Sequence, residues 1–150
     1  MAVDLAHASP ATFADAIAAA TKPVVVSHTG VQATCPGPRN LSDAQLRAVA
    51  ATGGVVGIGF WDSAVCGTDA RAIVRAIRHA ASVVGAEHVA FGSDFDGAVT
   101  TPFDAAGLAE LTDALLADGF RDEEIRLIAG VNVVRLLRQT LPGDAGMKEP

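Results

Sequence analysis

The chain is poor in the residue types that mark several large protein classes. It has only 2 cysteines among 150 residues, which are too few for a disulfide scaffold. Cys35 and Cys66 also lie too far apart in the sequence for a CxxC metal site. Two free thiols in the core are the default interpretation, and a single bridge between two loops is the alternative. Charged residues make up 19% and the net charge is -6, which argues against nucleic acid as a partner because phosphate binding favours a basic face.

Long hydrophobic runs are also absent. No run approaches the ~18 apolar residues of a membrane span. The first residues, MAVDLAH, lack the basic n-region and the apolar h-region of a signal peptide. We therefore expect no transmembrane segment and a cytoplasmic location by default. Because 50% of the residues are hydrophobic, we expect one domain with a sizeable core at residues 1–141, followed by a disordered tail at 142–150.

Strands and helices are predicted to alternate along the chain. Apolar and β-branched runs predict strands at 2–5, 23–28, 53–61 and 88–93. Helical patterns follow them at 9–20, from Ser42 onward, and at 68–85, 106–119 and 121–141. Ser9 before Pro10 predicts a helix start, and Ser42 with Gln45 matches a capping box.

The alternation predicts an α/β fold with a parallel sheet and right-handed crossovers. About four βα units make up half of an eight-stranded (β/α)8 barrel. An open doubly wound sheet is the alternative, because periodicity alone does not separate the two.

Polar side chains fall where three of the predicted strands end. His7 follows the first strand, His28 ends the second and Asp94 ends the fourth. In a parallel sheet these residues share one edge, where such folds place their active sites. Imidazoles and a carboxylate are typical ligands of catalytic zinc, although two histidines alone leave a zinc site incomplete. Arg39 lies in the loop after the second strand, where its guanidinium can bind a carboxylate in bidentate fashion.

The two other histidines are predicted to have no role in this site. His79 lies in the middle of a helix among arginines, so we expect a solvated surface residue. His88 lies at the start of its strand, at the opposite end from the site, so we expect a structural residue.

Six motifs occur in an order and spacing that resemble one known family. They are DLAHAS, PVVVSHTG, the pair Arg39–Asn40, GGVVGIGF, HVAFGSDFDG and GVNVVRLL. Together they resemble the C-terminal half of the membrane (renal) dipeptidase family, zinc peptidase family M19, up to about Leu137. The resemblance implies a (β/α)8 barrel that hydrolyses dipeptides with two bridged zinc ions.

The resemblance also implies roles for individual residues. His7 and His28 correspond to ligands of one of the two zinc ions. Arg39 corresponds to the arginine that binds the terminal carboxylate of the substrate. Asp94 corresponds to the aspartate that contacts the metal-bound water and moves its proton, whereas Asp96 is expected to brace the loop.

The two cysteines also have counterparts in members of the family that the chain resembles. Some members bridge cysteines at these two positions, and we therefore expect the Cα atoms of Cys35 and Cys66 to lie within about 7 Å.

The chain departs from the family in its metal ligands. The N-terminal half of the family carries a His-x-Asp pair and a bridging glutamate, and this chain contains no His-x-Asp. We therefore predict the C-terminal half of a zinc-dependent dipeptidase that is inactive alone, with an incomplete ligand set for one zinc ion. The alternative is a non-catalytic dipeptidase-like α/β domain that acts in binding or assembly.

A half-barrel also predicts partners. Its two edge strands and the strand faces that line a barrel interior are left unpaired and exposed. We therefore expect docking with the missing N-terminal half-barrel or self-association, in addition to binding of a dipeptide substrate.

Overall fold

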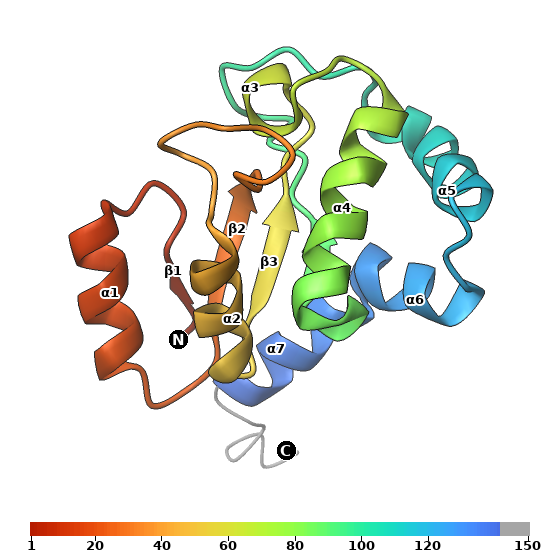
Figure 1. Cartoon of the computed structure of the whole chain (residues 1–150). Coiled ribbons are helices and arrows are strands. Elements are labelled where there is room, and N and C mark those ends of the chain that lie inside the picture. Colours follow the sequence, from red (N-terminus) through yellow and green to blue (C-terminus); the bar gives the residue numbers. More distant parts are fainter. Residues whose placement is uncertain (142–150) are drawn as a thin grey trace, which may run out of the picture.

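A four-stranded parallel sheet forms the centre of the computed structural model, which describes residues 1–141 (Figure 1). The predicted tail at 142–150 lies outside the described residues. The strands are β1 (Val3–Asp4), β2 (Val24–Thr29), β3 (Val55–Ile58) and β4 (Val89–Phe91). Their order in the sheet is their order in the sequence, β1-β2-β3-β4. A doubly wound sheet reverses its order at a switch point. The uninterrupted order excludes that alternative and agrees with consecutive βα units of a barrel, and the predicted fold class is confirmed.

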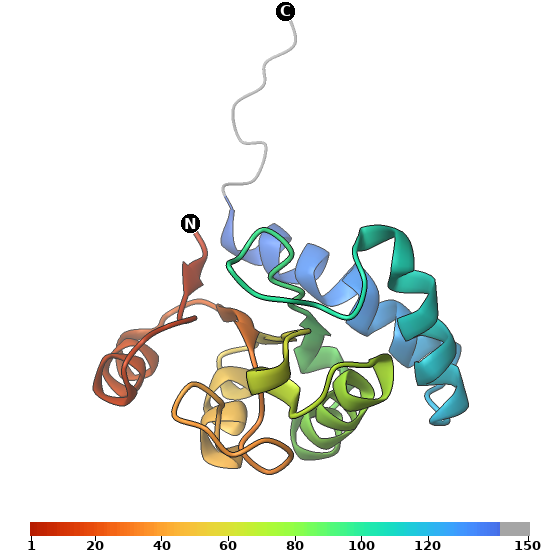
Figure 2. The same ribbon diagram turned by 90° about the horizontal axis from the view of Figure 1, so that it is seen from above.

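The helices follow the strands as the sequence predicts. They are α1 (Pro10–Ala19), α2 (Asp43–Ala51), α3 (Asp62–Val65), α4 (Ala70–Val84), α5 (Leu108–Ala117), α6 (Asp122–Arg126) and α7 (Asn132–Thr140). Figure 2 shows α1, α2 and α4 along one face of the sheet. The Ser9 hydroxyl caps α1 and the capping box of Ser42 and Gln45 opens α2, as predicted. Within residues 1–141, no helix is long and apolar enough to cross a membrane.

The two faces of the sheet have different environments. Side chains on one face are buried in the main core under the helices, among them Val26, Val56 and Val89. The alternate residues Val55 and Ala90 belong to a second, smaller apolar cluster. Successive strand side chains point to opposite faces, so this second cluster lies on the face that would line a barrel.

The last predicted helix, 121–141, is wrong as a single element. It consists of α6, a π-helical turn (Leu127–Val131) and α7. The break falls at Gly130, whose φ of 177° is not helical. The apolar pattern continues through the break, which is why periodicity does not reveal it. The short helix α3 was also not predicted.

Helix α7 crosses the edge of the sheet at which the strands begin (Figure 1). The Arg135 guanidinium donates hydrogen bonds to the carbonyls of Gly53 (3.0 Å) and Glu87 (2.8 Å), which precede β3 and β4. At the other end of the helix, the Met1 ammonium donates to the carbonyl of Thr140 at 2.8 Å. The helix therefore spans this edge from β4 to the start of β1.

The crossing helix covers part of the inner sheet face. Leu136 of α7 is 2% exposed and packs with Val55 and Ala90. The expectation that the barrel-lining faces are exposed is therefore wrong for this layer, because α7 folds across it. Within the described residues β1 and β4 are the edge strands, as predicted, and Val3 of β1 is an exposed large apolar residue.

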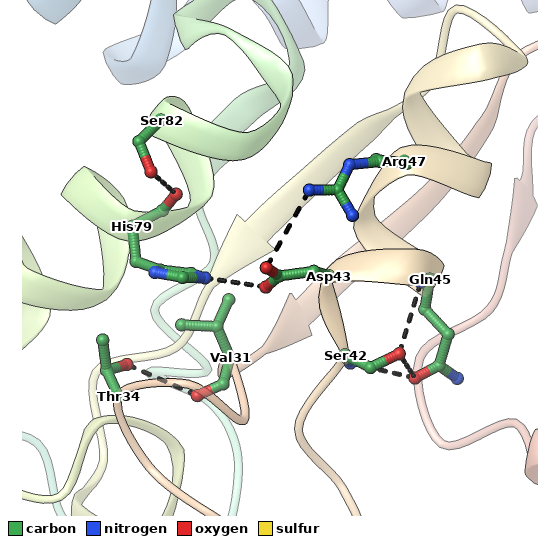
Figure 3. Close-up of polar contacts among 8 residues, drawn as sticks. All are labelled: Val31, Thr34, Ser42, Asp43, Gln45, Arg47, His79 and Ser82. Carbon is green, nitrogen blue, oxygen red and sulfur yellow. Dashed lines mark hydrogen bonds and ion pairs between the residues drawn. The ribbon is translucent and has the colours of Figure 1, made fainter.

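The prediction that His79 is a solvated surface residue is wrong. Its Nε2 atom lies 2.7 Å from a carboxylate oxygen of Asp43, so the pair ties α4 to the first turn of α2 (Figure 3). Arg47 lies 4.0 Å from the other oxygen. A position in the middle of one helix does not show which residue the neighbouring helix places opposite it. The structural role of His88 is confirmed, because its Nδ1 atom contacts the carbonyl of Gly54 at 2.8 Å.

The two cysteines form a disulfide bond. The Cα atoms of Cys35 and Cys66 lie 5.2 Å apart, which confirms the expected proximity and overturns the default of two free thiols. The bond joins the loop after β2 to the end of α3. Spacing along the sequence does not show this contact, because β2 and β3 must pair before their loops meet.

Replacing both cysteines by serine is expected to lower the free energy of unfolding by about 3 kcal/mol, because the bond closes a loop of sequence separation 31. Urea unfolding of the oxidised chain and of the Cys35→Ser/Cys66→Ser variant measures the difference. A reductant should destabilise the wild-type chain and leave the variant unchanged. Equal stability of the two oxidised proteins would contradict a stabilising bridge.

Candidate functional site

His7 and His28 lie together where β1 and β2 end. Their Nε2 atoms are 2.9 Å apart, and their ring centroids are 4.9 Å apart. The prediction that these two residues share one edge of the sheet is confirmed, and the structure also brings their side chains into contact. His7 has a φ of 63°, a left-handed conformation that is uncommon for residues other than glycine. Such backbone conformations cluster at functional sites.

An irregularity in β2 aims His28 at this position. The pairing of β2 with β3 shifts register between Val26 and Thr29. With regular pairing, His28 would lie opposite Ile58, whose side chain is buried under the helices. Thr29 takes that place instead. The extra residue is a β-bulge, a feature that often redirects a side chain next to an active site, and it turns the imidazole toward His7.

Arg39 completes a cluster with the two histidines. Its guanidinium donates a hydrogen bond to Nδ1 of His7, and all three side chains line one small pocket. The side chain is exposed, but its backbone is fixed, because the Thr29 hydroxyl donates to the Arg39 carbonyl at 2.9 Å. The structure therefore places Arg39 on the predicted side of the sheet.

Asn40 is a residue whose importance the sequence did not reveal. It is 2% exposed, and its amide oxygen accepts from the Gly30 N–H at 3.1 Å. Its amide nitrogen donates to the carbonyls of Cys35 at 2.7 Å and Ala64 at 3.2 Å. Together with the disulfide, Asn40 holds the loop that carries Arg39. The loop around Asn40 is rich in proline and glycine, so its sequence resembles that of an exposed turn and does not indicate a buried side chain.

The hydrogen bonds of the cluster run in one direction, from Arg39 through His7 and His28 to Ser27. One guanidinium nitrogen of Arg39 lies 3.3 Å from Nε2 of His7 and closer to Nδ1. Because a guanidinium only donates, we assign the closer nitrogen, Nδ1, as the acceptor and place the His7 proton on Nε2. That proton is donated to Nε2 of His28, which leaves the His28 proton on Nδ1. Nδ1 of His28 then donates to the Ser27 hydroxyl at 2.9 Å. These proton positions are assigned from the partners of each nitrogen.

Asp4 is a second residue that sequence reasoning missed. Its Oδ1 atom accepts from the backbone N–H groups of Ala6 and Ser27, both at 3.0 Å. Burial alone would raise the pKa of Asp4, but hydrogen bonds from the Ser27 hydroxyl and from these two N–H groups lower it below its ordinary value. The Asp4 side chain is therefore an ionised acceptor at neutral pH.

Asp94 lies at the same edge of the sheet but does not join the cluster. It follows β4, which is separated from β2 by β3, and it has a left-handed φ of 60°. Its carboxylate folds over Gly97, where a Cβ atom would lie 2.4 Å from Oδ1. Asp96 is exposed, and its carboxylate has no hydrogen bond or ion pair to other residues of the described chain, so the expected bracing contact is not observed.

The histidine pair fits part of a metal site. Two imidazole nitrogens converge at 2.9 Å, and neutral imidazole is a common zinc ligand. In residues 1–141, however, no group of three or more His, Cys, Asp or Glu side chains could hold a metal ion. The donors present are therefore suitable in kind and incomplete in number.

A parallel half-barrel with paired histidines, an arginine and a strained aspartate at its carboxyl edge has the organisation of barrel-type metallohydrolases. The chain belongs to the membrane dipeptidase family, peptidase family M19, which it matches over residues 1–149.

Individual relatives support this membership. The chain is 38% identical over 148 residues to an uncharacterized protein in the pqqA 5' region of Klebsiella pneumoniae, covering 92% of this chain and 54% of that protein. It is 35% identical over 145 residues to dipeptidase ataJ of Aspergillus terreus, covering 91% of this chain and 35% of that protein. The chain therefore spans about half or less of the length of these relatives.

A solved structure shows the same arrangement of elements. It is the metallopeptidase of Rhodobacter sphaeroides, crystallised with a phosphinate mimic of the dipeptide L-Ala-D-Ala. The TM-score is 0.86 at 31% identity, over 92% of this chain and 42% of that chain. The partial coverage agrees with a half-barrel.

Proposed function

We propose that this chain supplies the C-terminal half of a zinc-dependent dipeptidase and is inactive without the other half. The observation that carries the proposal is the convergence of the His7 and His28 Nε2 atoms at 2.9 Å beside the guanidinium of Arg39. Membership of a dipeptidase family and a relative crystallised with a dipeptide mimic support the choice of substrate.

His7 and His28 are the residues that would hold the metal. A bound zinc ion supplies Lewis acidity, which lowers the pKa of a water molecule to about 7 and makes it nucleophilic at neutral pH. The remaining ligands must come from outside residues 1–141, because the described chain offers no third donor near the pair. The family's N-terminal half, with its His-x-Asp pair and bridging glutamate, is the proposed source.

Arg39 binds the substrate and Asp94 transfers the proton in this proposal. The Arg39 guanidinium pairs with the terminal carboxylate of the substrate, which fixes the peptide in register and favours short substrates. The Asp94 carboxylate takes the proton of the attacking water and delivers it to the leaving amine. Asp94 must therefore turn away from Gly97, over which it folds in this structure.

Dipeptide hydrolysis by the purified chain tests the proposal. The chain is measured alone and mixed with the N-terminal half of the related Rhodobacter sphaeroides enzyme, with and without zinc. We expect hydrolysis only in the mixture with zinc, because only the mixture has a complete ligand set. His28→Ala in the same mixture is the matched control, and it should abolish the reaction.

Two outcomes would contradict the proposal. Hydrolysis by the chain alone would show that the described residues suffice. A folded, zinc-loaded mixture without activity would instead favour the alternative, a dipeptidase-like domain that acts in binding or assembly.

A further inference from the structure

We infer that Asp4 is a positioning residue for both histidines, and that Ser27 transmits its effect to the His28 ring. The inference deepens the proposed function and rests on it, since it concerns how the two proposed ligands are held. Neither residue belongs to the cluster of His7, His28 and Arg39, and neither was predicted from the sequence.

The contacts of Asp4 have a specific pattern. Its Oδ1 atom accepts two backbone N–H groups, from Ala6 and from Ser27, each at 3.0 Å. Each of these residues immediately precedes one histidine of the pair. One carboxylate therefore joins the turn that carries His7 to the bulge that carries His28. The two segments are 21 residues apart in the sequence, and this carboxylate links them directly beside their functional side chains.

Ser27 extends the contact to a ring nitrogen. Its hydroxyl lies 2.9 Å from Nδ1 of His28, and the Ser27 backbone is held by Asp4. The contact with His7 leaves the His28 proton on Nδ1, and the Ser27 hydroxyl accepts that proton, which holds the ring with its Nε2 lone pair facing His7. Histidine ligands generally use their second nitrogen in this way, and loss of the outer partner typically weakens metal binding by 10–100-fold.

A matched pair of Ser27 variants tests this inference. Ser27→Ala removes the acceptor, whereas Ser27→Thr keeps a hydroxyl at the same position. In the metal-free chain, the ring ¹⁵N signals of His28 should report the Nδ1–H form in the wild type and in Ser27→Thr. They should report a smaller share of the Nδ1–H form in Ser27→Ala, because only the contact with His7 then favours that form. A zinc titration followed on the same signals should show about 10–100-fold weaker binding for Ser27→Ala.

Asp4 is tested with a second pair. Asp4→Ala removes the link between the two segments, and Asp4→Asn keeps an oxygen that accepts the same N–H groups. We expect Asp4→Ala to weaken zinc binding at least as much as Ser27→Ala, and Asp4→Asn to retain most of it. Far-UV circular dichroism checks that each variant is folded, and the conservative member of each pair supplies the comparison if the alanine variant is not.

The results separate this inference from the proposed function. Unchanged His28 tautomer and zinc affinity in folded Ser27→Ala and Asp4→Ala chains would overturn the positioning role and leave the metal site intact. Failure of zinc to shift the His7 and His28 signals of the wild type in the mixture with the N-terminal half would overturn the proposed metal site. In that case the ring signals of the metal-free chain still decide whether Ser27 orients His28.

Discussion

Replacing Asp94 by asparagine is expected to lower kcat for dipeptide hydrolysis by about 10²–10⁴-fold in the mixture of this chain with the N-terminal half of the related Rhodobacter sphaeroides enzyme. The amide has the size of the carboxylate but does not take a proton from the attacking water. Zinc affinity should be unchanged, because Asp94 has no hydrogen bond to His7 or His28 in the described chain. Steady-state kinetics and a zinc titration of the same preparation measure both effects.

Asp96→Asn is the matched control for this experiment. It makes the same chemical change two residues away, at an exposed side chain. It should leave kcat within about twofold of wild type, since surface substitutions away from special features have small effects. Equal losses in the two variants would show that the charge of the loop matters and that Asp94 has no specific role in proton transfer.

Replacing Gly57 by alanine is expected to lower the free energy of unfolding by about 3 kcal/mol or more. A Cβ atom there would lie 2.1 Å from the backbone oxygen of Ser27 and 3.1 Å from the Cα atom of Gly92. Because the obstacle is backbone, the strands must move apart to admit the methyl group. Urea unfolding followed by circular dichroism measures the loss.

Gly37→Ala controls for the general effect of replacing glycine. A Cβ atom at Gly37 would meet only the side-chain nitrogen of Asn40, at 3.8 Å, so the space is available. We expect its stability to remain within about 1 kcal/mol of wild type. Wild-type stability of Gly57→Ala would show that β2 and β3 tolerate a wider spacing than the structure has.

Local sequence patterns account for most of the fold. The β-branched run at β2 and the serine caps of α1 and α2 are local signals, and each was read correctly. The break at Gly130 was missed, because the residues on both sides keep a helical apolar pattern. The disulfide and the pair of His79 with Asp43 join segments that only the assembled sheet and helices bring together.

The candidate site likewise has features that the sequence predicts and features that it does not. His7, His28 and Arg39 were located by their place after strands, because parallel strands end at one edge. The bulge that redirects His28 and the carboxylate of Asp4 were not foreseen. Both depend on the register between neighbouring strands, which a single strand sequence does not specify. The contacts that bring the site residues together therefore emerged only from the paired strands.

The contact between Arg39 and His7 implies that Arg39 and a metal ion would compete for the His7 ring. A metal ion on Nε2 of His7 needs the lone pair of that nitrogen, so the ring proton must move to Nδ1. Nδ1 now accepts from Arg39, and a guanidinium has no lone pair with which to accept a proton in return. The hydrogen bond from Arg39 and a metal ion on Nε2 would therefore exclude each other on this ring. If His7 held a metal in this way, the Arg39 guanidinium would have to leave the ring and would be free to pair with a carboxylate.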